Sequence, residues 1–483
     1  MTSTILLSHL QEPTETSIRL STLQSVLSHQ LSIAPSTSTA TSRLTVTQLT
    51  ATAISSPFFH PASQAFECVK VQAFETAFRH AIHLLRQQRS KSDHGNLTQW
   101  TRDVITGVQG GHPILRLAAC GGILLGVEDL TKSADPNKAP IQIARTLVES
   151  ETVVALAEVL DSTTVVYTEW EHEFQLHRRS GRQILAQDAL LIAFVLASHS
   201  LPLVDPQKLS ALPMYVLARL LTGILVSFFR HSDPNSDAIP DPNSPTDLSQ
   251  VPSLAKLTSI ILSALVNSTH ARSYARTLGT LSDTFNALLD LSRTIEQTYI
   301  ENPSHQIPKQ FLFTTLSLSQ SFLSSIIYLR PQSIARHPDS SLTPSSIALT
   351  ILQTLTNLSL VISQFGGVTK AFEQLPKVFY LCIDVTLSSG WQKNSRDKGN
   401  YQENKYEDVE AYVLHLSQFL QTQAPEAGRH LPFLTIDALI VCYVVPTLPF
   451  LAKLSFALST FEQLVPVLSP HSIINNVWAV CYP

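Results

Sequence analysis

The chain has 483 residues, more than the roughly 250–300 that one hydrophobic core usually serves, so we expect two lobes or one elongated array of helices. Charged residues make up only 14% of the sequence, against about 25% in a typical soluble protein, and the formal net charge is -4. The Lys and Arg residues form no basic stripe, so nucleic acid is not an expected partner.

Apolar residues return every three or four positions along most of the chain, as in Phe66, Val69, Phe74 and Phe78. This is the period of one face of an α-helix. The expected helices are 20–31, 66–85, 114–130, 140–160, 183–200, 208–229, 254–267, 272–300, 310–329, 346–364, 368–388, 406–422 and 433–468. The best strand candidate, Thr163 to Tyr167, can equally continue a helix. The sequence therefore predicts an all-α fold.

Three polar segments interrupt the helical pattern. Ser32 to Ser56 is rich in Ser and Thr, Ser232 to Pro252 is rich in Pro, Asp, Asn and Ser, and Ser388 to Glu407 is mainly polar. We expect all three to be flexible. The second is the expected linker between an N-terminal helical lobe, residues 1–231, and a C-terminal helical lobe, residues 253–483.

Long helices that alternate with short polar turns are typical of antiparallel helix pairs stacked side by side. We expect an irregular α-solenoid of the HEAT or armadillo kind, because no repeat consensus of fixed period is present. A globular multi-helix bundle is the alternative.

Two apolar stretches approach the length of a transmembrane helix, which needs about 20 apolar residues. Met214 to Phe229 contains Arg219, and Ala438 to Ala452 carries Pro446 and Pro449. We expect core helices in both places and no transmembrane helix. Peripheral attachment to a membrane stays open.

No motif predicts a catalytic residue, a cofactor or a metal site. The five cysteines lie far apart without CxxC spacing, so buried thiols are expected. His80 and His83 lie on one helix, but no neighbouring carboxylate or thiol completes a metal set. Gly121, Gly122 and Gly126 form no phosphate-binding loop, and their spacing indicates close packing of another helix. We expect a protein that is not an enzyme.

The candidate partner-binding residues are Trp100, Arg102 and Trp170. Trp100 and Arg102 share one expected helix, and Trp170 lies in a stretch rich in Glu. Core packing is the alternative for Trp100 and Arg102, because Trp in a periodic position usually faces inward. An ordinary exposed turn is the alternative for Trp170.

The segment Gly95 to Gly107 (GNLTQWTRDVITG), followed by Leu115 to Asp129 (LRLAACGGILLGVED), resembles the fungal peroxin-8 family of peroxisome biogenesis factors. Weaker similarity follows in the same order. It covers Ser273 to Arg276 at the start of a long helix, Leu349 to Phe365, and the apolar stretch after Pro432. The resemblance spans most of the chain, and its first two blocks are the specific ones.

This resemblance implies a helical-repeat protein on the lumenal face of the peroxisomal membrane. Family members are thought to bridge the receptor-docking complex and the RING ubiquitin-ligase complex, and to contact the cycling import receptor. For this chain it implies protein partners, peripheral membrane association and a scaffold role. A cytosolic helical-repeat adaptor of an unrelated complex is the alternative function.

The sequence departs from the family pattern in its targeting signals. Some members end in a tripeptide of the Ser-Lys-Leu type, whereas this chain ends Cys481-Tyr482-Pro483. Arg19-Leu20 and Arg43-Leu44 are not followed by the His or Gln that the other import signal requires. We therefore expect entry through an internal receptor-binding surface or together with another protein, unless the chain continues beyond this terminus.

Overall fold

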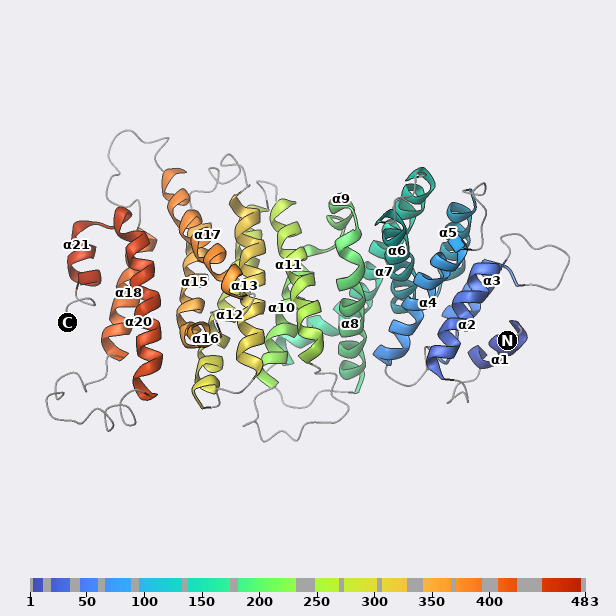
Figure 1. Cartoon of the computed structure of the whole chain (residues 1–483), viewed down its shortest axis with the longest axis horizontal. Helices are drawn as coiled ribbons and strands as arrows, with labels where there is room; N and C mark the ends of the chain where they lie inside the picture. Colours follow the sequence, from blue (N-terminus) through green and yellow to red (C-terminus); the bar gives the residue numbers. More distant parts are fainter. Residues whose placement is uncertain are drawn as a thin grey trace. The chain divides into compact units, whose positions relative to one another are not determined.

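In the computed structural model, the residues whose placement is described are almost all helical (Figure 1). They are residues 3–11, 19–34, 44–59, 66–87, 95–132, 138–173, 181–231, 248–268, 273–301, 306–327, 342–365, 371–392, 407–423 and 445–478. No strand occurs among them, which confirms the all-α prediction. The chain divides into two compact units, Met1–Pro213 and Met214–Pro483, and each is described by itself.

The first unit stacks its helices in two layers. One layer contains α2 (Leu20–Ile33), α4 (Cys68–Gln87), α6 (Pro113–Lys132) and α8 (Gly181–Ser200), and the other contains α3 (Val46–Ile54), α5 (Gly95–Val108) and α7 (Lys138–Glu173). The short elements are α1 (Ser3–Gln11), η1 (Leu201–Leu203) and α9 (Pro206–Leu209). Because each helix packs against the next but one in sequence, the stacking within this unit is solenoid-like.

The second unit follows the same pattern. One layer contains α10 (Met214–His231), α12 (Tyr274–Glu301), α15 (Pro344–Asn357) and α18 (Glu407–Gln423), and the other contains α11 (Val251–Asn267), α13 (Gln306–Ile327) and α17 (Ala371–Gln392). The remaining elements are η2 (Leu248–Gln250), α16 (Ser359–Phe365), α20 (Val445–Leu464), η6 (Val465–Val467), α21 (Pro470–Ser472) and η7 (Ile473–Trp478). The orange and red helices of Figure 1 include α20, which packs against α16 and α18.

Polar side chains join alternate helices within the second unit. Tyr215 and Thr277, like Thr222 and Thr284, are hydrogen-bonded across 62 residues of sequence and join α10 to α12. Ser263 and Ser325 are also 62 residues apart and join α11 to α13. The spacing is not constant, because Ser259 and Ser317 join the same two helices α11 and α13 across 58 residues.

Helix α4 shows how the apolar period forms the core. Phe74, Phe78 and Ile82 are fully buried, as their spacing predicts. The apolar period places Val69 on the same face, but Val69 is 66% exposed. The helix begins only at Cys68, so Val69 lies in its first turn, and Val71 takes the buried position instead.

The glycines of α6 bring its backbone close to α4. A Cβ atom on Gly122 would lie 2.1 Å from the carbonyl oxygen of Glu75, and one on Gly126 would lie 3.1 Å from that of Arg79. No side chain fits at the first of these positions. The structure therefore confirms that this glycine-rich stretch serves helix packing.

Ion pairs fix the other faces of α6. The Arg116 guanidinium is buried and pairs with Glu151 and Glu158 of α7. On the α4 side, Arg79 Nε lies 2.7 Å from Asp129 Oδ2. Arginine pairs with carboxylates in a fixed planar geometry, so these contacts set the register of α6 against both neighbours.

The division of the chain lies earlier than the expected linker at 232–252. α10 belongs to the second unit, because its buried face packs against α11 and α12. The Phe229 and Phe311 rings, 5.1 Å apart, also join it to α13. Residues 232–247 of the expected linker lie outside the described residues, and Val251 and Pro252 already belong to α11.

Part of the Ser/Thr-rich segment 32–56 is helical: residues 46–54 form α3, while residues 35–43 lie outside the described residues. The Thr45 and Gln48 side chains form a reciprocal capping box that starts α3. Thr47 Oγ1 donates to the Asp103 carbonyl of α5 at 3.1 Å. In the expected loop 388–407, residues 388–392 continue α17, and 393–406 lie outside the described residues.

No described helix is long and apolar enough to cross a membrane. The stretch Met214 to Phe229 forms most of α10, and Arg219 is exposed on it. Of the stretch Ala438 to Ala452, residues 438–444 lie outside the described part, and α20 begins at Val445.

The described cysteines are free thiols. Cys120 and Cys382 are buried, and burial raises the pKa of both, which suppresses their reactivity as thiolates. Cys68 is half-buried, and desolvation raises its pKa as well. The prediction of buried thiols is confirmed for Cys120 and Cys382, while Cys442 and Cys481 lie outside the described residues.

Candidate binding pocket

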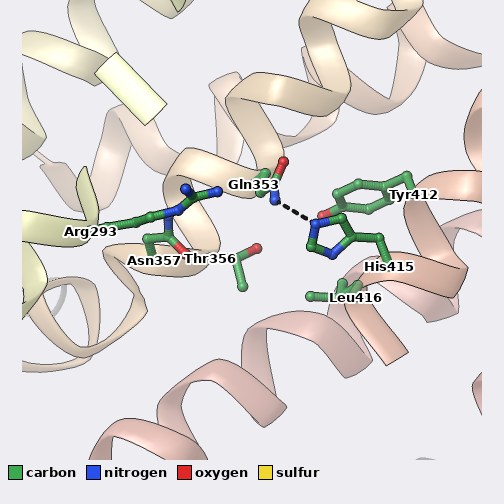
Figure 2. Close-up of a pocket in the computed structure, with 7 residues that line it drawn as sticks. All are labelled: Arg293, Gln353, Thr356, Asn357, Tyr412, His415 and Leu416. Carbon is green, nitrogen blue, oxygen red and sulfur yellow. Dashed lines mark hydrogen bonds between the residues drawn. The ribbon is translucent and has the colours of Figure 1, made fainter. Parts of the chain in front are cut away.

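The second unit contains a pocket of about 180 Å³ along one of its layers (Figure 2). Three successive helices of that layer line it. α12 contributes Arg293, α15 contributes Gln353, Thr356 and Asn357, and α18 contributes Tyr412, His415 and Leu416. Spacings of three and four residues on α15 and α18 place the contributing side chains on one face of each helix.

Hydrogen bonds hold the floor of the pocket in place. Asn357 Nδ2 donates to Ser292 Oγ at 2.8 Å, which joins α15 to α12. The Thr356 hydroxyl donates to the Leu352 carbonyl of its own helix at 2.8 Å. Thr356, Asn357 and Leu416 are all buried, so packing as well as hydrogen bonding restrains this side of the pocket.

Two polar contacts form the rim. The Gln353 Nε2 and His415 Nε2 atoms lie 3.4 Å apart across the mouth, as the dashed line in Figure 2 shows. Arg293 extends from α12 toward the pocket, and its guanidinium lies 4.0 Å from Asp290 with both side chains well exposed. An exposed ion pair at this distance is weak, so Asp290 neutralises little of the positive charge of Arg293.

The Tyr412 side chain joins α18 to α15 beside this pocket. Tyr412 is 8% exposed, and its hydroxyl has the Thr356 side chain as its hydrogen-bond neighbour. Burial raises the pKa of Tyr412, and the contact with Thr356 opposes that rise. The hydroxyl therefore stays protonated at neutral pH.

The lining contains no Ser, Cys or Lys, and the hydroxyl of its one Thr, Thr356, donates to the Leu352 carbonyl of its own helix. The volume is below the roughly 300–1,000 Å³ of pockets that enclose a drug-sized ligand.

No protein-family model matches the chain, and no curated protein matches it.

The predicted partner-binding residues do not lie in this pocket. Trp100 is 1% exposed in the first unit, and its indole Nε1 donates to the Leu31 carbonyl at 2.9 Å. Core packing, the alternative raised from the sequence, is what the structure shows for Trp100. Arg102 is exposed on the same helix and stays available to a partner.

Trp170 belongs to α7, but its side chain lies outside the described part of the structure. The same holds for the Glu-rich residues around it. Its role as a partner-binding residue stays a prediction.

His83 of α4 has a carboxylate neighbour on another helix. Asp129 of α6 lies 3.1 Å from His83 Nε2, but the same carboxylate is already hydrogen-bonded by Arg79. A carboxylate held by a guanidinium is a poor partner for a metal ion, and no group of possible metal ligands occurs among the described residues.

No pattern in the sequence indicates the pocket. Its polar residues are amides, a histidine and a tyrosine, types that also occupy ordinary helix surfaces. These residues come together only through the register of α12, α15 and α18, since Gln353 and His415 lie 62 residues apart. No signal within any one helix could have found them.

Proposed function

We propose that this chain is a non-enzymatic scaffold of peroxisomal matrix protein import. In this role it bridges the receptor-docking and RING ubiquitin-ligase complexes on the lumenal face of the membrane and contacts the import receptor. The observation that carries the proposal is the resemblance of residues 95–107 and 115–129 to the fungal peroxin-8 family.

The residues in these two segments have structural roles in the first unit. Trp100 fills the core of the first unit, Gly122 lets α6 approach α4, and Arg116 and Asp129 pair with the helices on either side. These residues specify how the helices stack. They support a shared architecture, and the partners in the proposal come from the family alone.

The general form of the molecule supports a binding role. Stacked helices present long surfaces without an enclosed reaction centre, and such surfaces suit the joining of several proteins.

The decisive experiment is localisation of the full chain in fungal cells. The chain carries a fluorescent protein at its N-terminus and is imaged beside a peroxisomal marker. Isolated organelles are then treated with protease, with and without detergent. The proposal expects punctate signal that resists protease until detergent is added.

Two controls make that result interpretable. A matrix enzyme must be protected, and a membrane protein with a cytosolic domain must be cleaved, in the same preparation. Diffuse signal, or puncta that are degraded without detergent, contradicts a lumenal scaffold. Diffuse signal favours the alternative of a cytosolic adaptor.

A second experiment tests the surface of α5. Arg102→Ala removes an exposed charge, so folding is expected to change by less than about 0.5 kcal/mol while capture of the docking and RING complexes falls. Gln99→Ala on the same exposed side of α5 is the matched control. Unchanged capture by a folded Arg102→Ala chain excludes Arg102 from the interface.

A further inference from the structure

We propose that Glu75 of α4 and His199 of α8 form a proton-dependent contact that fastens the end of α8 to the rest of the first unit. The contact tightens when the imidazole of His199 takes up a proton. This inference goes beyond the proposed scaffold role and depends neither on the organelle nor on a partner.

Glu75 is a buried carboxylate with few hydrogen-bonding partners. Its side chain is 7% exposed, and its Oε1 atom has no hydrogen-bond partner within the described part of the chain. Its Oε2 atom lies 3.4 Å from His199 Nδ1. A buried carboxylate is costly unless a cation or several donors replace its hydration, so a positive charge on His199 would stabilise this site.

The helix packing restrains the carboxylate beside the end of α8. A Cβ atom on Gly121 of α6 would lie 3.1 Å from Glu75 Oε1 and 3.5 Å from the Cβ atom of Ser200 on α8. Gly121 therefore leaves room for the carboxylate where α4, α6 and α8 meet. On its other side, Gly122 brings the backbone of α6 against the Glu75 carbonyl oxygen.

His199 is placed to gain and lose a proton. Its side chain is 38% exposed, so solvent reaches the imidazole. It lies in the last turn of α8, where unpaired carbonyl groups favour a positive charge. An unperturbed histidine takes up its proton near about pH 6.5, so a modest fall in pH charges this side of the contact.

On α4 itself, no second cation is hydrogen-bonded to Glu75. Arg79 attracts the Glu75 carboxylate through space, but its hydrogen bonds go to Asp129 of α6. Burial and the charge of Glu75 raise the pKa of Cys68, so that thiol stays neutral. His199 is therefore the group that can bring a positive charge into direct contact with Glu75.

The elements packed against α4 and α8 bring no competing charge to the pair. The described side chains of α8 and η1 include no other titratable group, and Cys120 of α6 is a buried thiol whose pKa burial raises. His29 of α2 and Asp161 of α7 are exposed. The remaining charged groups described on α6 and α7 pair with one another or with Arg79 and Lys208, and they are Arg116, Glu128, Asp129, Lys132, Arg145, Glu149, Glu151 and Glu158.

His83 provides an internal comparison on the other side of α4. Its Nε2 atom lies 3.1 Å from Asp129, closer than His199 lies to Glu75. However, Asp129 already accepts two hydrogen bonds from the Arg79 guanidinium, at 2.7 and 3.1 Å. A proton on His83 places a second cation beside Arg79, whereas a proton on His199 gives Glu75 a cation in direct contact. The response to pH should therefore belong to His199.

The sign of this dependence follows from the charged pair. In mild acid the imidazolium and the carboxylate attract one another across α4 and α8. As the pH rises the imidazole releases its proton, and the stabilisation is lost. Acid loss of the Asp129 contact lies below about pH 4, so the two effects occupy separate ranges of pH.

The test is hydrogen exchange of the full chain at about pH 8 and about pH 6, on either side of the ordinary imidazole titration. Protection factors of peptides from residues 190–200 remove the intrinsic effect of pH on exchange. Protection should rise about tenfold more from the higher to the lower pH in wild type than in His199→Gln, as one charge-assisted hydrogen bond warrants. Glu75→Gln, which keeps the shape of the side chain, should lose the rise as well.

His83→Gln is the matched control, because it removes the other imidazole that contacts a carboxylate beside α4, and it should keep the rise. Peptides from α12 in the second unit should respond alike in all four proteins. Circular dichroism checks the folding of each variant, and His199→Gln, at a partly exposed position, decides the matter if Glu75→Gln does not fold.

Three results would overturn the proposal. The first is equal protection of α8 at both pH values in wild type. The second is a rise that persists in His199→Gln. The third is a rise that His83→Gln abolishes and His199→Gln keeps, because Asp129 would then be the responsive carboxylate.

Discussion

The ammonium group of Lys453 lies 2.6 Å from one carboxylate oxygen of Glu296 and 2.8 Å from the other, although 157 residues separate them in sequence. Both side chains are buried. Desolvation raises the pKa of Glu296, and the hydrogen bond and charge of Lys453 oppose that rise. The pair therefore joins α20 to α12 and specifies where α20 docks, because any other position leaves two buried charges unpaired.

Lys453→Met should destabilise the second unit by about 3 kcal/mol, because it leaves the Glu296 carboxylate buried without its partner. Hydrogen exchange of peptides from α12 and α20 measures the loss locally. The double variant Lys453→Met with Glu296→Met should recover most of it, since both buried charges are gone. Lys256→Met, at an exposed lysine of α11, is the control and should change stability by less than about 0.5 kcal/mol. If Lys453→Met behaves like this control, the pair has no structural role.

The Asp129 carboxylate predicts a pH dependence for the first unit. Its hydrogen bond from Arg79 lowers the pKa of Asp129, burial opposes this, and a hydrogen bond from His83 lowers it further. The unfolded chain, with an Asp pKa of about 3.9, then binds more protons than the folded chain in acid. The stabilisation is complete above about pH 4 and is lost as the pH falls through the folded pKa.

Melting temperatures measured from neutral pH into acid test this dependence. The wild-type curve should fall more steeply below about pH 4 than the curve of Asp129→Asn, which has no carboxylate to protonate. Asp283→Asn, at an exposed aspartate of α12, should keep the wild-type slope. Parallel curves for wild type and Asp129→Asn would show that the Arg79 pair adds nothing to folding.

Gly122 and Gly223 should respond to alanine in opposite directions. A Cβ on Gly122 would lie 2.1 Å from the Glu75 carbonyl oxygen, so Gly122→Ala must separate α6 from α4 and should cost about 1–3 kcal/mol or more. Gly223 has nothing within 4 Å of its Cβ position on α10, so Gly223→Ala should stabilise by about 0.5–1 kcal/mol. Thermal unfolding of both variants beside wild type measures the two changes in stability. Equal effects would contradict the close packing of α4 and α6.

Helix content followed from local sequence, whereas the relations between helices did not. The expected helix 272–300 corresponds to α12 (Tyr274–Glu301), because its period of three to four is a property of adjacent residues. The expected helix 346–364 is broken between α15 and α16 at Leu358, where no Gly or Pro marks the end. Tertiary packing of α16 against α20 accompanies that break and has no local signal.

The glycine stretch of α6 could be predicted from the sequence, whereas the pocket could not. Close packing at Gly122 was predictable, because few other roles fit paired glycines inside an apolar helix. The pocket depends on Arg293, Gln353 and Tyr412 meeting across three helices, and nothing local to any of them indicates that meeting. The same holds for Lys453 and Glu296, each of which alone resembles an ordinary charged surface residue.

Tyr412→Phe separates the two roles of the pocket tyrosine, its packing and its hydroxyl. The ring stays in place, but the hydroxyl and its contact with Thr356 are lost, so the second unit should be destabilised by about 1 kcal/mol. Tyr299→Phe is the matched comparison, because the Tyr299 hydroxyl donates to the Gln364 side-chain carbonyl oxygen, and its removal should also destabilise by about 1 kcal/mol. Urea unfolding of both variants beside wild type measures the two losses. If Tyr412→Phe is as stable as wild type while Tyr299→Phe is destabilised, the Tyr412 hydroxyl contributes nothing to the docking of α18 on α15.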